Sequence, residues 1–297
     1  MKINLEKYKK YLNAYTILFF CVLLLYSISL LLPMVWAFIS SVKTRRDFSV
    51  EPFNLPNTWE WKNYKVAFFH FFVEYRNDEG TLIKTYMDQM MVNSFLYAGT
   101  CAFISTFVAC IMAYMTSKYT YKFSKILYTV VIICMIIPIV GSLPSELQMA
   151  KNLGLFGHLY GMWAMKATFL GMYFLVFYAI FKQIPWDYAE SAFVDGASHY
   201  RVMFQIMLPM AKTTFLTVFL LYFIQYWNDY QTPLIFMPHF PTASYGMFVY
   251  QNSYVNEINS IPMQLAGSMI VTLPILAIFL LFKNRLMGNL TMGGLKG

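Results

Sequence analysis

Charged side chains are scarce in this sequence. Only 12% of its 297 residues are Asp, Glu, Lys or Arg, and 59% are hydrophobic, whereas soluble domains carry about 25% charged residues. This balance excludes a disordered chain, and the lack of a Gly-X-Y or heptad period excludes collagen and coiled coil. The formal charge is +8, but the basic residues are spread through apolar sequence and offer no basic polar face to nucleic acid. We therefore expect a membrane protein surrounded by lipid, with no nucleic-acid partner.

Patterns of catalytic and metal-binding residues are also missing. The four cysteines lie singly inside apolar runs, and the four histidines are isolated from one another, which favours neither a disulfide framework nor a metal site. No Gly is followed by Lys, so the chain has no Walker A phosphate loop. We predict no catalytic residue, no metal and no cofactor in this chain, and hence no enzymatic activity of its own.

Long apolar runs dominate the sequence. A membrane-spanning helix needs about 20 such residues, and the pattern predicts an all-α, polytopic membrane protein with six transmembrane helices. The first run is too long for a cleaved signal peptide and is expected to be retained. The predicted spans cover residues 15–41, 90–117, 126–145, 160–181, 213–236 and 258–282.

The loop charges predict the orientation of these spans. With segments 1–14, 118–125, 182–212 and 283–297 placed inside, the inner side holds 13 of the 22 basic residues but only four of the 14 acidic ones. Lys and Arg are retained on the cytoplasmic side, so both termini are expected in the cytoplasm and loops 42–89 and 237–257 outside. Within loop 42–89, residues 70–89 are expected to form an amphipathic interfacial helix broken at 78–80.

The inner loop 182–212 carries the clearest local pattern. Pro185 suits the first turn of a helix, Asp187 and Glu190 suit its N-terminal dipole, and Gly196 suits its end. The pattern predicts a short helix here and a second one beginning at Ser198. Trp186, Ala189 and Phe193 share one face of the first helix, and we interpret this apolar face as a surface that fits a groove in a partner.

The same loop resembles a known family motif. Its residues follow the EAA motif of ATP-binding-cassette (ABC) importer permeases, E-A-A-x3-G-x9-I-x-L-P, with Ser191 at the second position. The resemblance implies the type I permease fold of these importers and a coupling helix that docks in a separate ATPase subunit, which holds ATP and Mg²⁺. The predicted coupling residues are Trp186, Asp187, Glu190, Ser191, Ala192, Phe193, Asp195, Gly196, Ile206, Leu208 and Pro209.

The end of the fifth predicted span is rich in aromatic and amide side chains. Aromatic faces stack on sugar rings, and amides and carboxylates bind hydroxyls. Asp229 is alternatively an interfacial group that reaches toward water. Two prolines beside Gly141 interrupt the third span and are expected to shape the same cavity. The predicted substrate-path residues are Asn93, Ser94, Gln225, Trp227, Asn228, Asp229 and Tyr230.

The Trp-Asn-Asp sequence at 227–229 and the Gly-rich ending at 290–297 are similar to maltose-type carbohydrate permeases, although Asn289 replaces a glycine of that ending. The resemblance implies a location in a bacterial cell membrane and four partner subunits. These are a second permease, two copies of an ABC ATPase and an extracellular sugar-binding protein. It also implies that the tail reaches between the ATPases, whereas composition alone equally allows a disordered end. The predicted contacts with the binding protein are Tyr245, Tyr250, Gln251, Asn252 and Tyr254.

Three alternatives remain open at this point. An ABC importer of peptides, amino acids or lipids would share the same loop. A secondary transporter would need an inverted repeat and intramembrane ion ligands, and neither is found in the sequence. A structural membrane protein would tolerate changes between Glu190 and Gly196.

Overall fold

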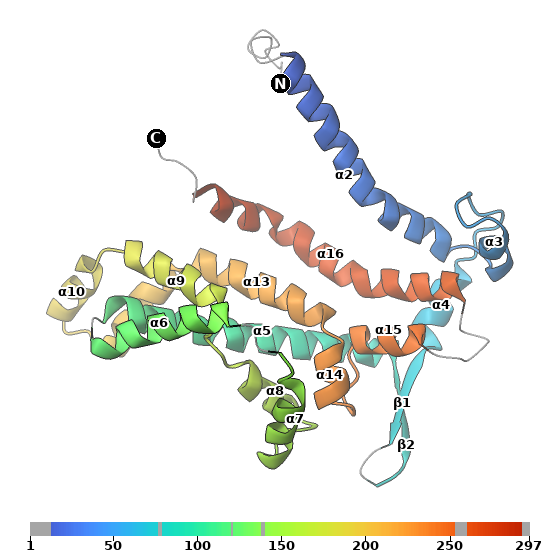
Figure 1. Cartoon of the computed structure of the whole chain (residues 1–297). Coiled ribbons are helices and arrows are strands. Elements are labelled where there is room, and N and C mark those ends of the chain that lie inside the picture. The colour runs from blue at the N-terminus through green and yellow to red at the C-terminus, as the bar shows by residue number, and fades with distance from the viewer. Residues whose placement is uncertain (1–12, 77–78, 120, 138–139, 253–259, 293–297) are drawn as a thin grey trace. The chain divides into compact units, whose positions relative to one another are not determined.

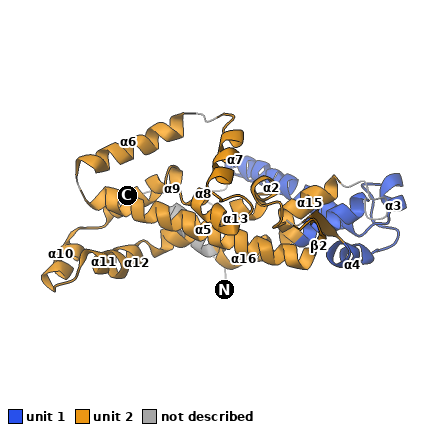
Figure 2. Ribbon diagram, turned by 90° about the horizontal axis from the view of Figure 1, so that it is seen from below, with its two compact units in different colours: residues 1–70, 253–270 blue, residues 71–252, 271–297 orange. Residues whose placement is uncertain are grey.

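The computed structural model describes residues 13–76, 79–119, 121–137, 140–252 and 260–292, which are mostly helical (Figure 1). The chain divides into two compact units (Figure 2), whose described parts lie within residues 1–70 and 253–270 for one unit and within residues 71–252 and 271–297 for the other. The elements are α2 (Ala14–Ser41), α3 (Arg45–Val50), α4 (Lys62–Phe69), β1 (Phe72–Arg76), β2 (Leu82–Tyr86), α5 (Met87–Lys118), α6 (Lys122–Ile136), α7 (Leu143–Asn152), α8 (Leu159–Lys166), α9 (Met172–Gln183), α10 (Asp187–Val194), α11 (His199–Val202), the π-helical turn η1 (Met203–Met207), α12 (Leu208–Met210), α13 (Lys212–Asn228), α14 (Gln231–Phe236), α15 (Ala243–Gln251) and α16 (Ile261–Met292).

The first unit contains α2, α3 and α4. Most apolar side chains of α2 are exposed, as expected for a helix whose surroundings are lipid. Just after α2, Lys43 is completely buried, and its amine donates hydrogen bonds to the backbone oxygens of Glu51 (2.8 Å) and Pro52 (3.1 Å). Asn63 of α4 donates to the carbonyls of Ser41 and Lys43 (2.8 Å each). These bonds satisfy the buried donors and tie α4 to the end of α2.

The second unit begins with a β-hairpin, so the helix predicted over 70–89 is wrong. Strands β1 and β2 pair antiparallel with Glu74 opposite Lys84, whose charged groups lie 3.0 Å apart. The segment alternates side chains and is rich in Val, Ile, Thr and aromatics, which favours a strand over a helix. Gly80, with a φ of +80°, lies in the connecting turn where L residues are strained.

Helix α5 is the centre of the second unit and packs along α9 and α13. Small residues recur along its buried face at a spacing of three or four, including Ala98, Ala102, Ser105, Ala109 and Ala113. Such a stripe allows neighbouring helix backbones to approach closely, which is how helices associate within membranes.

The regions predicted as the third and fourth spans are interrupted. The helix that begins at Lys122 ends at Ile136, and Gly141 has a φ of +76° before α7 starts. Pro138 lies outside the described residues. Helices α8 and α9 divide the predicted span 160–181, with an irregular stretch over 167–171 between them.

Among the described helices, three are long and apolar enough to cross a membrane: Ala14–Ser41, Met87–Lys118 and Ile261–Lys283. A fourth candidate is the pair His199–Met210 and Lys212–Asn228, which is bent by 74°. The fold is thus that of a helical membrane protein, and the number of six spans stays a prediction.

Candidate functional site

The predicted helix in loop 182–212 is present as α10. Asp187 and Glu190 lie in its first turn, where carboxylates stabilise the helix dipole. At its end the Gly196 N–H donates to the Phe193 carbonyl (3.0 Å) and the Ala197 N–H donates to the Ala192 carbonyl (2.9 Å). This is the Schellman arrangement, which requires a residue with positive φ at its turn. Gly196 has a φ of +80°, so its predicted role at the helix end is confirmed.

The second helical segment of the loop begins at the predicted cap. The Ser198 hydroxyl accepts a hydrogen bond from the Arg201 N–H at 3.3 Å. The segment continues through the π-helical turn η1 to Met210 and then bends into α13. Ile206 and Leu208 are half-buried and Pro209 is exposed. π-Helical turns inside helices are frequent at functional sites.

The apolar face of α10 packs against the chain's own core. Ala189 is 0% exposed and Ala192 is 8% exposed, and both belong to a buried cluster that includes residues of α5, α9 and α13. Trp186 contacts Tyr119 edge to face, with ring centroids 5.9 Å apart, and Phe193 packs on His199 at 4.7 Å. The interpretation of this face as the docking surface is therefore wrong, because the chain's own core buries Ala189 and Ala192 and half-buries Trp186 and Phe193.

The opposite face of α10 is exposed and acidic. Asp187, Glu190, Ser191 and Asp195 are exposed, and Val194 is 87% exposed. The two ion pairs found in the described part of the chain, Lys84 with Glu74 and Lys166 with Asp229, lie elsewhere. These carboxylates are thus available to cationic groups of another protein. We call α10 to α12, with this exposed face, the coupling loop.

A second group of polar side chains gathers around Asp229, directly after α13. Its carboxylate accepts hydrogen bonds from the Tyr97 hydroxyl of α5 (3.1 Å) and from the Thr232 N–H (3.0 Å). The Lys166 amine at the end of α8 lies 3.9 Å from the Asp229 carboxylate. The Lys166 side chain is 25% exposed and the Asp229 side chain is 19% exposed.

Two further side chains extend this group. The centroid of the Tyr226 ring lies 5.1 Å from the Lys166 amine, and the Tyr226 hydroxyl is 2.8 Å from the Ser105 hydroxyl. Ser105 in turn donates to the Lys166 carbonyl at 2.9 Å. We call Tyr97, Ser105, Lys166, Tyr226 and Asp229 the polar cluster.

A cavity of about 260 Å³ adjoins the polar cluster and shares Lys166 with it. Its polar lining also includes Glu146 of α7, Gln231 and Thr232. Hydroxyl, amide, carboxylate and ammonium groups within one region can exchange hydrogen bonds with a polyhydroxylated solute.

Three of the predicted substrate-path residues serve the scaffold instead. Asn93 donates to the Pro241 carbonyl (2.9 Å), and Ser94 accepts from the Ala243 N–H (2.7 Å). Trp227 is 1% exposed and its indole N–H donates to the Val271 carbonyl at 3.1 Å. These side chains are buried on backbone groups, so the prediction that they line a path is wrong.

The other predicted path residues lie on exposed positions, apart from Asp229. Gln225 and Asn228 are exposed, and Asn228 donates to the Ile224 carbonyl of its own helix at 2.9 Å. Tyr230 stacks on Phe248 with ring centroids 4.6 Å apart. Only Asp229 of the predicted set belongs to the polar cluster. The sequence analysis missed Tyr97, Ser105, Lys166 and Tyr226. One signal for them was present in the sequence, since a lysine within an apolar stretch, such as Lys166, requires a counter-ion.

The predicted contacts with a binding protein lie on and after α15. Tyr245 and Tyr250 are 6% and 1% exposed, which excludes direct contact through their rings and raises the pKa of both phenols. Gln251 and Asn252 are exposed. Tyr254 and the Gly-rich tail beyond Met292 lie outside the described residues. Within the described ranges, no group of three His, Cys, Asp or Glu side chains is placed to hold a metal ion.

A solved structure shares this architecture. A crystal structure of a bacterial ABC transporter involved in the import of the acidic polysaccharide alginate superposes with a TM-score of 0.74 at 18% identity, covering 91% of this chain and 95% of that one. This likeness shows that the chain has the fold of an ABC importer permease.

Relatives by sequence are named as sugar permeases. The diacetylchitobiose uptake system permease protein NgcG of Streptomyces coelicolor is 24% identical, with 91% of this chain and 86% of that protein covered. The arabinooligosaccharides transport system permease protein AraQ of Bacillus subtilis is 24% identical over 98% of both chains. The trehalose transport system permease protein SugB of Mycobacterium tuberculosis is 25% identical, over 90% and 93% of the two chains.

The sequence profile of one transporter family matches most of the chain. The match covers residues 82–290, from the second hairpin strand through the polar cluster and the coupling loop to the last helix. The chain therefore belongs to the family of binding-protein-dependent transport system inner membrane components.

Proposed function

We propose that this chain is one permease subunit of an ATP-driven importer for oligosaccharide or another carbohydrate. Its partners are a second permease, two copies of an ABC ATPase and an extracellular sugar-binding protein. The relatives named for diacetylchitobiose, arabinooligosaccharides and trehalose support a sugar over a peptide, an amino acid or a lipid. ATP and Mg²⁺ belong to the ATPase, since this sequence has no phosphate loop.

The topology that we propose has six spans with both termini in the cytoplasm. Helices α2, α5 and α16 supply three of them, and α13, the second helix of the bent pair, supplies a fourth. The remaining two come from the regions of α6 with α7 and of α8 with α9, each interrupted by irregular backbone. Such interruptions are tolerated at membrane depth where they are covered by protein or line a cavity.

The seating of α10 is the observation that carries this proposal. Ala189 and Ala192 hold the helix in the same buried cluster as α5, α9 and α13, while the acidic face is exposed. A helix held this way moves with the bundle when a partner pulls on its outer face. Rotation of the ATPases is thereby transmitted to the spans as alternating access.

Helix α13 joins the coupling loop to the polar cluster. It begins at Lys212, directly after the loop, and ends at Asn228, directly before Asp229. Its 17 residues extend over about 25 Å. Movement of the loop therefore reaches Asp229 through one continuous helix. We place the sugar path beside the polar cluster, where Asp229 accepts hydrogen bonds from sugar hydroxyls and Lys166 donates hydrogen bonds to them.

Gly196→Asp in the complete importer tests the coupling role. A side chain at a φ of +80° is strained, and the added carboxylate adjoins an already acidic face. We expect membrane insertion to persist while sugar uptake is abolished and less ATPase co-purifies. Gly154→Asp is the matched control, because Gly154 also has a positive φ of +66° but lies at the end of α7. Uptake that survives Gly196→Asp with normal ATPase attachment would reject the proposal.

A further inference from the structure

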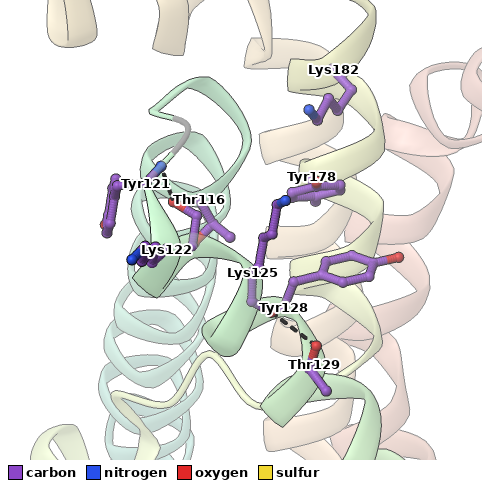
Figure 3. Close-up of a pocket in the computed structure, with 9 residues that line it drawn as sticks. Thr116, Tyr121, Lys122, Lys125, Tyr128, Thr129, Tyr178 and Lys182 are labelled. Atoms are coloured by element: carbon purple, nitrogen blue, oxygen red, sulfur yellow. Dashed lines mark hydrogen bonds between the residues drawn. The ribbon is translucent and has the colours of Figure 1, made fainter.

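A basic cavity lies beside the coupling loop, separate from the polar cluster. It measures about 550 Å³ and is lined by the end of α5, the first half of α6 and the end of α9 (Figure 3). The lining residues that bear on its chemistry are Thr116, Lys122, Lys125, Tyr128, Tyr178 and Lys182.

The lining carries three positive charges and no carboxylate. Lys122, Lys125 and Lys182 are exposed, and neither of the two ion pairs of the described residues includes them. Figure 3 shows Lys125 reaching from α6 toward Tyr178 of α9, with Lys182 one turn further along the same helix. Three like charges around one cavity repel one another, so an anion among them is stabilised.

A buried hydroxyl in the same cavity lacks a partner. Thr116 is 4% exposed, and within the part of the chain that the structure describes its Oγ1 makes no hydrogen bond. Leaving a buried hydroxyl unpaired is costly, whereas an oxygen of a bound anion would accept its proton. This observation is independent of the lysines and points to a ligand with acceptor oxygens.

The surface next to the cavity is apolar. Along α6, Ile126, Val130 and Ile133 follow the lysines and are exposed, and the Tyr128 and Tyr178 rings stand 4.7 Å apart at the boundary. Aromatic rings of this kind are enriched where lipid headgroups meet acyl chains. The ligand that fits both parts has an anionic head and a hydrocarbon tail.

We propose that this cavity binds the phosphate group of an anionic membrane phospholipid. Lys122, Lys125 and Lys182 neutralise the phosphate, Thr116 donates a hydrogen bond to it, and the acyl chains lie along α6. Lys182 is in the last turn of α9, four residues before Trp186, so the cavity and α10 share one end of the bundle. The assignment to the cytoplasmic leaflet rests on the proposed function, and basic pockets between spans on that side are known lipid-headgroup sites.

Titration of the purified, delipidated importer complex tests this site. Native mass spectrometry would count bound phosphatidylglycerol, with phosphatidylcholine as the neutral lipid. We expect tighter binding of phosphatidylglycerol, weakened about fivefold for each lysine removed, both in the single variants K122Q, K125Q and K182Q and in the triple variant K122Q/K125Q/K182Q. The matched control K62Q/K65Q/K212Q removes three exposed lysines outside the cavity and should bind like the unaltered complex.

Thr116→Val distinguishes the contribution of the hydroxyl to lipid binding from that of the lysine charges, because valine has the shape of threonine but no hydroxyl. We expect it to weaken binding of phosphatidylglycerol and to leave binding of phosphatidylcholine unchanged. It also keeps the test open if the triple lysine variant fails to assemble.

Four results would overturn the proposal. These are equal binding of the two lipids, equal loss in the control, unchanged binding in both Thr116→Val and the lysine variants, or inorganic phosphate displacing the lipid at comparable concentration, which indicates a site for a soluble anion. Retained lipid selectivity in a chain that shows no ATPase attachment would instead refute the proposed function and leave the lipid site standing.

Discussion

The coupling loop and the polar cluster lie at opposite ends of α13 and are built in opposite ways. The loop buries small apolar residues, Ala189 and Ala192, and exposes its carboxylates. The cluster largely encloses its charges, Lys166 and Asp229, among the hydroxyls of Tyr97, Ser105 and Tyr226. The difference matches the roles proposed for the two ends, contact with another protein at the loop and polar groups held inside the bundle at the cluster.

The construction also predicts how each end fails. At the cluster, loss of one group leaves a partly buried charge without its counter-ion. At the loop, a change on the buried face disturbs folding, whereas a change on the exposed face disturbs only docking.

The largest effect is expected from Asp229→Ala. Loss of a fully buried partner costs about 3–5 kcal/mol, and the 3.9 Å separation and partial exposure of this pair reduce the expected cost to about 1–3 kcal/mol. We expect sugar uptake at equal expression to fall about tenfold to a hundredfold. Adding Lys166→Met should restore the level of folded protein but not the uptake. Normal uptake in Asp229→Ala would remove the cluster from the sugar path.

A pair of leucine substitutions on the two faces of α10 comes next. Ala189→Leu overpacks the core, and we expect the free energy of unfolding to fall by about 1–3 kcal/mol, measured by thermal unfolding of the complex. Ser191→Leu places the same side chain on the exposed face and should change it by less than about 0.5 kcal/mol, while less ATPase co-purifies. Equal destabilisation by both variants would contradict the assignment of the faces.

A smaller effect is expected from Trp227→Phe. The substitution removes the indole donor to the Val271 carbonyl, a hydrogen bond worth about 1 kcal/mol. Uptake per folded transporter should stay unchanged, because this side chain is buried in the scaffold. Uptake assays normalised to folded protein check this, and a fall in uptake without loss of stability would return Trp227 to the sugar path.

Local sequence rules were sufficient for the coupling loop. The ends of α10 follow from Asp187, Glu190 and Gly196, because dipole and positive-φ preferences act within a few residues. Which face of α10 is buried depends on its packing against α5, which is distant in sequence, and against α9. The apolar pattern alone predicted the wrong face for docking.

Long-range pairing also explains the other misses. Asn93, Ser94 and Trp227 have the side chains of a binding site, but their partners are backbone groups more than 40 residues away. The segment of β1 and β2 was predicted as a helix because it mixes apolar and charged side chains, which is typical of an interfacial helix as well as of a strand. The alternation of its side chains distinguishes the two and favours the strand. Asp229 was predicted for the substrate path without Lys166, because only the fold brings the two side chains together.

Photo-crosslinking from α10 tests the central claim most directly. Benzoylphenylalanine placed at Tyr188, which is 51% exposed, should crosslink to the ATPase subunit in intact membranes. The same group at Phe193, on the buried face, should crosslink within the permease chain. No crosslink to an ATPase from Tyr188 in a complex that still imports sugar, or an ATPase crosslink from Phe193 alone, would contradict the account.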